Sequence, residues 1–267
     1  MQMREVYSHF NLSADPFTRE IKTEHLKKLP GVNEALEGLQ ILFDTRGIGI
    51  LTGKSGSGKT CLLRMATEAL HQGTYQAHYI CHTSVGILEF YTHLCHTFGL
   101  QPGGRRAPMF QAIHDHILNM HRTKHVHPVL IIDEADKLGN DILQEIRMLT
   151  NFNYDSQNAL SILLCGQEPL IQKLGLTSLE SLANSVTVTV RMNTLKREET
   201  FSYIEQRIED VSTGGSLFTK ASMTLIHDAS SGVMRVIDNM GNHSLMKAYL
   251  SGKTMVEKEH VQAVLSR

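Results

Sequence analysis

A glycine-rich turn directly after a short apolar run is the feature that most constrains this fold. Residues 48 to 52 read IGILT and lead into GKSGSGKT at 53 to 60, which fits the pattern G-x-x-x-x-G-K-[ST]. This order predicts a buried strand, a phosphate-binding loop and a helix that begins near Lys59. The glycines let the backbone turn its N–H groups toward a phosphate, and the helix N-terminus adds the positive end of its dipole. The sequence therefore predicts an α/β fold that holds a nucleotide.

The residues of this loop have separate expected roles. Lys59 is expected to reach the β- and γ-phosphates as a catalytic cation, and Thr60 to ligate Mg²⁺. The residues expected to bind the nucleotide are Gly53, Lys54, Ser55, Gly56, Ser57, Gly58, Lys59, Thr60 and Cys61. The expected cofactors are therefore ATP and Mg²⁺.

A second apolar run ends in two carboxylates, in PVLIIDEADKL at residues 128 to 138. The run brings Asp133 to the carboxyl end of a strand, where it can hold Mg²⁺ through water. Glu134 follows directly and can polarise a water molecule for attack on the γ-phosphate. A metal ligand beside a base favours hydrolysis over phosphoryl transfer to a small molecule. We therefore expect an ATP hydrolase.

Strand-like and helix-like segments alternate along the first two thirds of the chain. The strand-like runs are residues 48 to 52, 77 to 82, 128 to 133, 159 to 166 and 185 to 190. The helix-like segments between them are 85 to 98, 108 to 121, 139 to 151 and 167 to 174. This alternation predicts a parallel sheet with helices on both faces.

The strands stop after Thr194, and only helices are expected beyond it. The helical segments are residues 197 to 211, 218 to 230, 233 to 250 and 255 to 266. The last is expected to open with a capping box, Thr254-x-x-Glu257. We therefore expect an α/β nucleotide-binding domain over residues 1–195 and a small all-α lid domain over residues 196–267.

Composition excludes few functions, but it indicates the cellular compartment. The chain is 41% hydrophobic, has no run near the roughly 18 apolar residues of a membrane span and does not begin like a signal peptide, so we expect a cytoplasmic protein. The four cysteines lack C-x-x-C spacing, which indicates reduced, mostly buried thiols. With 26 basic and 27 acidic residues, any nucleic-acid binding must depend on local patches.

The chain has fifteen histidines, several of them close to cysteines. His78 and His82 flank Cys81, and other histidines flank Cys95 in HLCH. Such residues could supply zinc ligands, but Cys81 is expected in a strand and Cys95 in a helix. The alternative is a population of core and solvated histidines, and the sequence leaves both open.

Four further segments carry a resemblance to a known family. They are HFNLSADPF at 9 to 17, LQEIRMLTNF at 143 to 152, LLCGQEPL at 163 to 170 and SGVMRVIDNM at 231 to 240. Taken in this order with the phosphate loop and the acidic pair, they resemble the AAA+ ATPases of the ExeA/TniB branch. That branch holds ATPases of general secretion and transposition helper ATPases. The resemblance covers nearly the whole chain and implies a P-loop AAA+ domain followed by a helical lid.

The resemblance also implies roles for individual residues. Gln167 lies where the family has its sensor 1 residue, which reads the γ-phosphate or orients the water, and Arg235 matches the sensor 2 arginine of the lid. Where the branch tends to have an arginine finger, this chain has Ser185. Arg191, Arg147 or a partner's arginine is expected to substitute; otherwise hydrolysis is slow, as suits a switch.

The resemblance finally implies a function. An ATPase with a lid, without a membrane span or a cell-wall-binding portion, is the layout of the transposition helpers. We therefore expect a homo-oligomeric ring or filament that binds double-stranded DNA and regulates target-site selection by a transposase, without a membrane. The expected phosphate contacts are Arg105, Arg106, Lys27 and Lys28. The alternative is a secretion-type ATPase or a nucleotide-gated scaffold that acts on protein partners without DNA.

Overall fold

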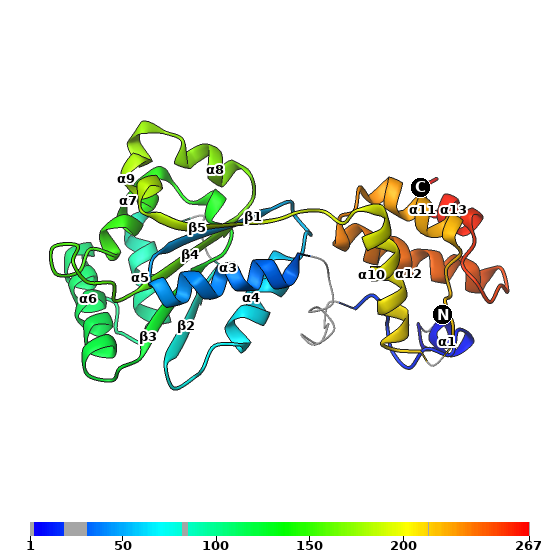
Figure 1. Ribbon diagram of the computed structural model, residues 1–267, viewed down its shortest axis with the longest axis horizontal. Coiled ribbons are helices and arrows are strands. Elements are labelled where there is room, and N and C mark those ends of the chain that lie inside the picture. Colours follow the sequence, from blue (N-terminus) through cyan, green and yellow to red (C-terminus); the bar gives the residue numbers. More distant parts are fainter. Residues whose placement is uncertain (1–2, 19–30, 82–84, 213, 267) are drawn as a thin grey trace. The chain divides into compact units, whose positions relative to one another are not determined.

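The computed structural model describes residues 3–18, 31–81, 85–212 and 214–266. The chain forms two compact units (Figure 1). An α/β unit contains Glu34–Gly53 and Leu62–Met192, and a helical unit contains Met1–Asn33, Lys54–Cys61 and Asn193–Arg267. In the part of the chain that is described, no helix has both the length and the hydropathy needed to cross a membrane.

A five-stranded parallel sheet forms the centre of the α/β unit (Figure 1). Its strand order is β2-β3-β4-β1-β5. The strands are β1 (Ile48–Gly53), β2 (Tyr75–Ile80), β3 (His127–Ile132), β4 (Ser161–Gly166) and β5 (Val186–Met192). The expected parallel sheet is confirmed. Because β2 ends at Ile80, the expectation that Cys81 lies in a strand is wrong, and Cys81 is exposed just after it.

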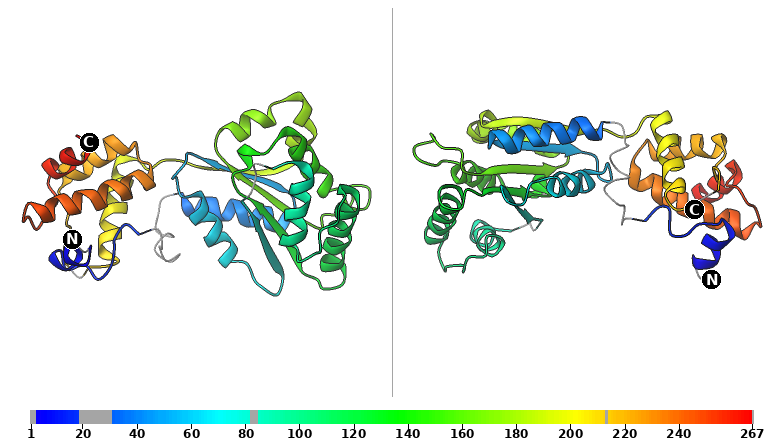
Figure 2. Two further views of the ribbon diagram at one scale, coloured as in Figure 1. Left: turned by 180° about the vertical axis from the view of Figure 1, so that it is seen from behind. Right: turned by 60° about the horizontal axis from the view of Figure 1, so that its bottom comes forward.

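Helices cover both faces of this sheet, as expected (Figure 2). On one face, Ile48 and Ile50 of β1 belong to a buried cluster with residues of α5 (Ile87–Thr97), α6 (Arg106–Arg122) and α7 (Asn140–Leu149). On the other face, Leu42 of helix α3 (Val32–Thr45) lies where a β-carbon on Gly49 would be. The close approach of α3 to β1 therefore requires glycine at that position.

Shorter elements of the α/β unit are η1 (Ala135–Lys137), α8 (Pro169–Leu174), η2 (Thr177–Leu179) and α9 (Glu180–Asn184). Helix α4 (Lys59–Glu68) continues from the phosphate loop and belongs to the α/β unit from Leu62 onward. Helix α4 begins at Lys59, as the sequence predicts. Helices α3 and α9 are absent from the elements expected from sequence.

The helical unit contains the predicted lid helices. They are α10 (Arg197–Glu209), α11 (Lys220–Ser230), α12 (Met234–Leu250) and α13 (Lys258–Leu265), accompanied by the N-terminal helix α1 (Met3–His9). The expected capping box with Thr254 is wrong. Helix α13 starts after Glu257, whose backbone N–H donates to Nδ1 of His260 at 2.9 Å.

The N-terminal segment belongs to the helical unit, whereas the sequence places it in the α/β domain. Arg207 of α10 is buried, and its guanidinium donates to the carbonyl oxygens of Pro16 at 2.5 Å and Thr18 at 2.8 Å. The Phe17 ring fills the space beside Gly241 of α12, where a β-carbon would lie 2.5 Å from it. The structural boundary near Asn193 is close to the expected one at 195. The expected α/β domain begins at residue 1, however, whereas the helical unit contains both ends of the chain.

Candidate active site

The phosphate loop has the backbone conformation that its glycines predict. Gly56 and Gly58 have φ angles of +79° and +93°, which disfavour residues with a β-carbon. The backbone N–H of Ser57 donates to the carbonyl of Lys54 at 3.1 Å and closes the turn. The side chain of Ser57 is buried, yet its hydroxyl has no hydrogen-bond partner among the described residues. The loop therefore has an unmatched polar group in addition to the glycine geometry of a phosphate site.

Lys59 and Thr60 are the first two residues of α4. The Nζ atom of Lys59 donates to the carbonyl of Lys54 at 3.0 Å, so the ammonium group lies over the loop. Thr60 is exposed, and its hydroxyl is an oxygen ligand of the kind that Mg²⁺ prefers. Both positions fit their expected roles toward a nucleotide and its metal, and these roles stay predictions.

Arg235 contacts the phosphate loop from the first turn of α12. Its Nη1 atom lies 3.4 Å from the Ser55 hydroxyl, and its backbone N–H donates to the Gly56 carbonyl at 3.2 Å. A β-carbon on Gly56 would lie 2.7 Å from Cβ of Arg235 and 3.1 Å from Cγ1 of Val233. The loop and the start of α12 are therefore in direct contact within the helical unit, as a sensor 2 role for Arg235 requires.

A tight turn sets the start of α12. Ser231 and Gly232 both have left-handed backbone angles, with φ of +50° and +72°, and they end helix α11. The carbonyl of Gly232 accepts a hydrogen bond from the Leu195 backbone N–H at 2.9 Å. Leu195 backbone atoms fill the space where a side chain on residue 232 would begin, so only glycine fits.

The acidic pair lies at the carboxyl end of β3, as expected. Asp133 is buried, and its backbone N–H donates to the Ile80 carbonyl at 2.8 Å. Its Oδ1 atom accepts from the Glu134 backbone N–H at 2.8 Å, and its Oδ2 atom accepts from the Tyr79 hydroxyl at 2.8 Å. Burial, followed by the hydrogen bond to Asp133, raises the pKa of Tyr79, so the phenol stays protonated and acts as a donor.

Glu134 has an unusual backbone and an exposed side chain. Its φ of +55° is left-handed, a conformation that costs energy for a residue with a β-carbon. The carboxylate accepts from Nζ of Lys137 at 2.6 Å, and this hydrogen bond is the main cause that raises the pKa of Lys137. A carboxylate at this place can act as a base toward water, which is the role predicted for Glu134.

Asp136 connects the turn after β3 to the end of β4. Its Oδ1 atom accepts from the backbone N–H of Gln167 at 2.9 Å, and its carbonyl accepts from Nζ of Lys173 at 2.6 Å. Gln167, the expected sensor 1 residue, is exposed directly after β4 and is held to the segment that follows the acidic pair. Its position fits the prediction, and its action on phosphate or water stays untested.

Sequence reasoning missed Tyr79, Asp136 and Lys173. Asp136 bonds to the backbone of Gln167, and Lys173 bonds to the carbonyls of Asp136 and Leu138. These contacts join segments that follow different strands, and no local sequence pattern marks them. Tyr79 lies in β2, which pairs with β3 in register Tyr79 to Ile131. The alternation of the chain predicts a parallel sheet but not which strands are neighbours, so it could not bring Tyr79 to Asp133.

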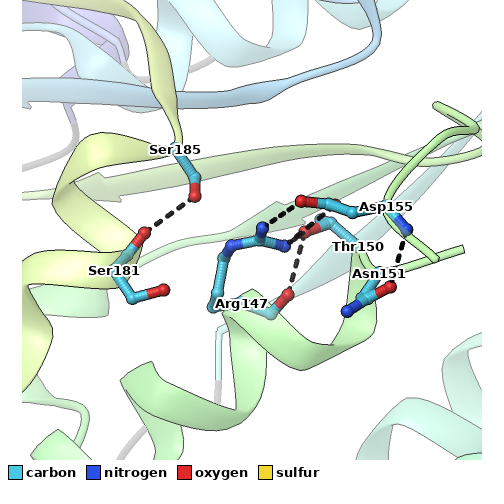
Figure 3. A network of polar contacts seen from close by, with 6 residues as sticks. All are labelled: Arg147, Thr150, Asn151, Asp155, Ser181 and Ser185. Atoms are coloured by element: carbon cyan, nitrogen blue, oxygen red, sulfur yellow. Dashed lines mark hydrogen bonds and ion pairs between the residues drawn. The ribbon is translucent and has the colours of Figure 1, made fainter.

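The two candidate arginine fingers are held in different ways. Arg147 of α7 has a side chain only 22% exposed and bonds to Asp155 at 2.6 Å and Thr150 at 3.2 Å (Figure 3). Arg191 of β5 has a side chain 64% exposed and pairs with the exposed Glu168 at 2.9 Å. Ser185 donates to the Ser181 carbonyl at 2.7 Å, as Figure 3 shows, and supplies no cation. Arg191 is the arginine with fewer contacts to break.

The expected DNA contacts receive uneven support. Arg106 pairs with Glu145 at 2.6 Å and lies over the ring of Tyr91, so its charge is matched within the chain. Arg105 is exposed at the start of α6. Lys27 and Lys28 lie outside the described residues. All four stay predictions.

Some of the histidines and cysteines belong to the α/β core, and others are half-buried or exposed. His78 and His127 are buried, and His114 stacks on the rings of Phe110 and Phe152. Cys95 and Cys165 are also buried. Within the described part of the chain, no group of three or more His, Cys, Asp or Glu residues has a geometry that could hold a metal ion. His82 lies outside that part.

A comparison with protein families identifies the fold. The family described as "AAA domain" matches residues 41–174, which is half of the chain. The chain belongs to the AAA domain family. The match includes the phosphate loop, both carboxylates of the acidic pair and Gln167. The family and the fold together identify an ATP-hydrolysing P-loop enzyme.

Relatives and solved structures agree with this assignment. The chain is 30% identical over 248 residues to general secretion pathway protein A of Aeromonas hydrophila, a match that covers 91% of this chain and 45% of that protein. It therefore spans less than half the length of this curated relative. Cdc6p of Pyrobaculum aerophilum has a similar structure, with a TM-score of 0.73 at 17% identity over 94% of this chain and 70% of that one. The Aeropyrum pernix ORC1 protein in complex with DNA gives 0.65 at 15% identity, over 89% and 65%.

Proposed function

We propose that this AAA domain is a nucleotide-dependent switch in which the lid responds to the phosphate loop. The observation that carries the proposal is the direct contact of Arg235 with Ser55 and Gly56. A γ-phosphate bound by the loop attracts the guanidinium, because a charge-assisted hydrogen bond to phosphate is stronger than one to a serine hydroxyl. Nucleotide state then changes the position of α12 within the helical unit.

The chain's own residues divide the hydrolysis reaction between them. Lys59 and the loop N–H groups bind the phosphates, and Thr60 and Asp133 are the proposed ligands of Mg²⁺. Mg²⁺, when bound, neutralises charge on the β- and γ-phosphate oxygens. Glu134 accepts the proton of the attacking water, and Gln167 orients that water or the phosphate.

The partner we propose is double-stranded DNA, on which the chain assembles as a homo-oligomer and directs a transposase to its target. The ordered motifs resemble a branch that includes transposition helpers, which supports this function, and a structurally similar ORC1 protein is in complex with DNA. Exposed Arg105 is a candidate for phosphate contact, which gives affinity without sequence choice. We also propose that the protein acts in the cytoplasm, because DNA is accessible there.

A second candidate is a switch that acts on protein partners. The identity of 30% to general secretion pathway protein A over 91% of this chain favours it. In that case the same hydrolysis cycle would proceed without DNA. The two candidates differ in one measurable property, the response of the ATPase to duplex DNA.

The experiment measures steady-state ATPase with and without duplex DNA and images Glu134→Gln with ATP and DNA by electron microscopy. The amide cannot accept the proton from water, so this variant should bind ATP, turn over very slowly and accumulate as a DNA-bound oligomer. Lys59→Ala is the control that should fail to bind ATP and to assemble. If the ATPase rate is the same with and without DNA, and no oligomer forms on DNA, the switch that acts on protein partners is favoured. Wild-type turnover by Glu134→Gln would remove Glu134 as the base.

A further inference from the structure

Strand pairing brings a phenol from β2 to the carboxylate predicted to hold Mg²⁺. Tyr79 lies opposite Ile131 in the register of β2 and β3, two residues before Asp133. The hydrogen bond from the Asp133 backbone N–H to the Ile80 carbonyl continues this pairing past the end of β3. The two side chains meet there, and the Tyr79 hydroxyl donates to Oδ2 of Asp133 at 2.8 Å.

This contact fixes one half of the Asp133 carboxylate. The other oxygen, Oδ1, accepts from the Glu134 backbone N–H, so each oxygen has one donor from the chain. Asp133 is only 8% exposed, and a buried carboxylate is stable only if donors replace the water it has lost. The two donors therefore set the orientation of the carboxylate plane, and each oxygen keeps a lone pair for another ligand.

The position of the Tyr79 ring shows that packing does not explain this residue. The residue as a whole is 48% exposed, although its hydroxyl is bonded to a buried carboxylate. A phenylalanine at this place would leave much the same area in water. What the tyrosine adds is the hydroxyl and its bond to Asp133.

We propose that Tyr79 is a positioning residue for the magnesium site, because its hydroxyl holds the Asp133 carboxylate in the orientation in which it meets the metal. The proposal rests on the function proposed above, in which Asp133 is a ligand of Mg²⁺. Partners that orient a metal ligand typically change metal affinity by about 10- to 100-fold when they are removed. The effect is expected in metal binding, because the Tyr79 hydroxyl bonds to the proposed metal ligand Asp133.

The chain offers a matched control on the same strand. Tyr75 begins β2, and its hydroxyl also donates to a carboxylate, Oδ1 of Asp44, at 2.8 Å. This pair lies at the opposite end of the strand and contains no residue of the proposed machinery. Tyr75→Phe removes the same chemical group with the same change in volume as Tyr79→Phe.

The test uses the whole chain and follows nucleotide binding, not turnover. The anisotropy of a fluorescent ATP analogue is measured as Mg²⁺ is added to wild type, Tyr79→Phe and Tyr75→Phe, with thermal unfolding as a check on folding. Tyr79→Phe should need about tenfold more Mg²⁺ for half of the metal-dependent change, while metal-free nucleotide binding stays the same. Tyr75→Phe should match wild type.

A double mutant separates positioning from a general effect. In an Asp133→Asn background the added Tyr79→Phe change should have no further effect on the Mg²⁺ midpoint, because the carboxylate it orients is gone. A wild-type midpoint in Tyr79→Phe, an equal shift in Tyr75→Phe, or full additivity with Asp133→Asn would each overturn the proposal. If wild type shows no nucleotide binding at any Mg²⁺ concentration, the nucleotide site itself is wrong and the proposal fails with it.

Discussion

At the scale of single residues, His127 shows how the core changes a titratable group. It begins β3, is 1% exposed and bonds through Nε2 to the Ser161 hydroxyl at 2.9 Å. Its Nδ1 atom has no partner among the described residues. Burial, followed by the nearby charges of Arg46 and His121, lowers the pKa of His127 to about 3. The folded protein therefore keeps this imidazole neutral.

The low pKa of His127 predicts a loss of stability in acid. The unfolded chain has the ordinary pKa of 6.5 and binds a proton below it, whereas the folded state resists protonation down to about pH 3. The free energy of unfolding should therefore fall as pH decreases through this window, by about 2 to 3 kcal/mol from this residue at pH 4.5. Urea unfolding at pH 7.5 and pH 4.5 measures it.

The variant that tests this is His127→Gln, which cannot titrate and keeps a group that can bond to Ser161. Its loss of stability between the two pH values should be smaller than that of wild type by the stated amount. His125→Asn is the control, because His125 is exposed and has a left-handed φ of +54° that asparagine tolerates. Equal acid sensitivity of wild type and His127→Gln would contradict the prediction.

At the scale of elements, α10 holds the N-terminal segment to the lid helices through one side chain. Arg207 has a side chain 5% exposed and donates to the carbonyls of Pro16 and Thr18 and to the Tyr203 hydroxyl. Asp238 lies 4.0 Å from it, and burial raises the pKa of Asp238 to about 6. The guanidinium thus donates to the carbonyls of Pro16 and Thr18, which lie outside any helix or strand.

Arg207→Gln should lower the free energy of unfolding by about 2 to 4 kcal/mol, because it removes the guanidinium that bonds to the buried Pro16 carbonyl and neutralises charge beside Asp238. Hydrogen exchange should also become faster in the segment around Phe17, because its neighbours Pro16 and Thr18 lose their bonds to α10. Arg197→Gln is the control on the same helix, since Arg197 forms an exposed pair with Asp228 at 3.1 Å and should cost less than about 1 kcal/mol. Equal effects of the two variants would show that Arg207 does not hold the N-terminal segment.

For the whole molecule, hydrolysis in the proposed oligomer requires a cation beside the γ-phosphate in addition to Lys59. If ATP lies between subunits of the proposed oligomer, an arginine from the neighbour must neutralise developing charge, and such a residue is worth roughly 10³ to 10⁵ in rate. Arg147 is held by Asp155 and Thr150, whereas Arg191 pairs, among the residues that the structure describes, with the exposed Glu168. Redirecting Arg191 therefore breaks fewer contacts.

Arg191→Ala should reduce DNA-stimulated ATPase by about 10³, and Arg147→Ala should reduce it much less. Mixing Arg191→Ala with Lys59→Ala subunits, each inactive alone, should restore turnover at interfaces that combine an intact loop with an intact arginine. Recovery would show action in trans. Normal hydrolysis by Arg191→Ala alone, with DNA present, would exclude it as the finger and leave a partner's arginine or slow intrinsic turnover.

Features that depend on short spans of chain could be predicted from the residues alone. A phosphate loop needs its glycines and lysine at fixed spacing, and Gly56, Gly58 and the start of α4 at Lys59 follow from that spacing. The acidic pair at the end of β3 and the helices after Thr194 follow in the same way, since runs of apolar residues and their period are local properties.

The tertiary structure alone decided which distant segments meet. Strand order brings Tyr79 to Asp133, and Arg207 joins residues 16 and 18 to the lid helices. Arg147 forms an ion pair with Asp155, and Arg106 forms one with Glu145. These contacts have no signature in a local window. They are the outcome of burying many side chains at once, and the gain of each contact depends on all the others being formed.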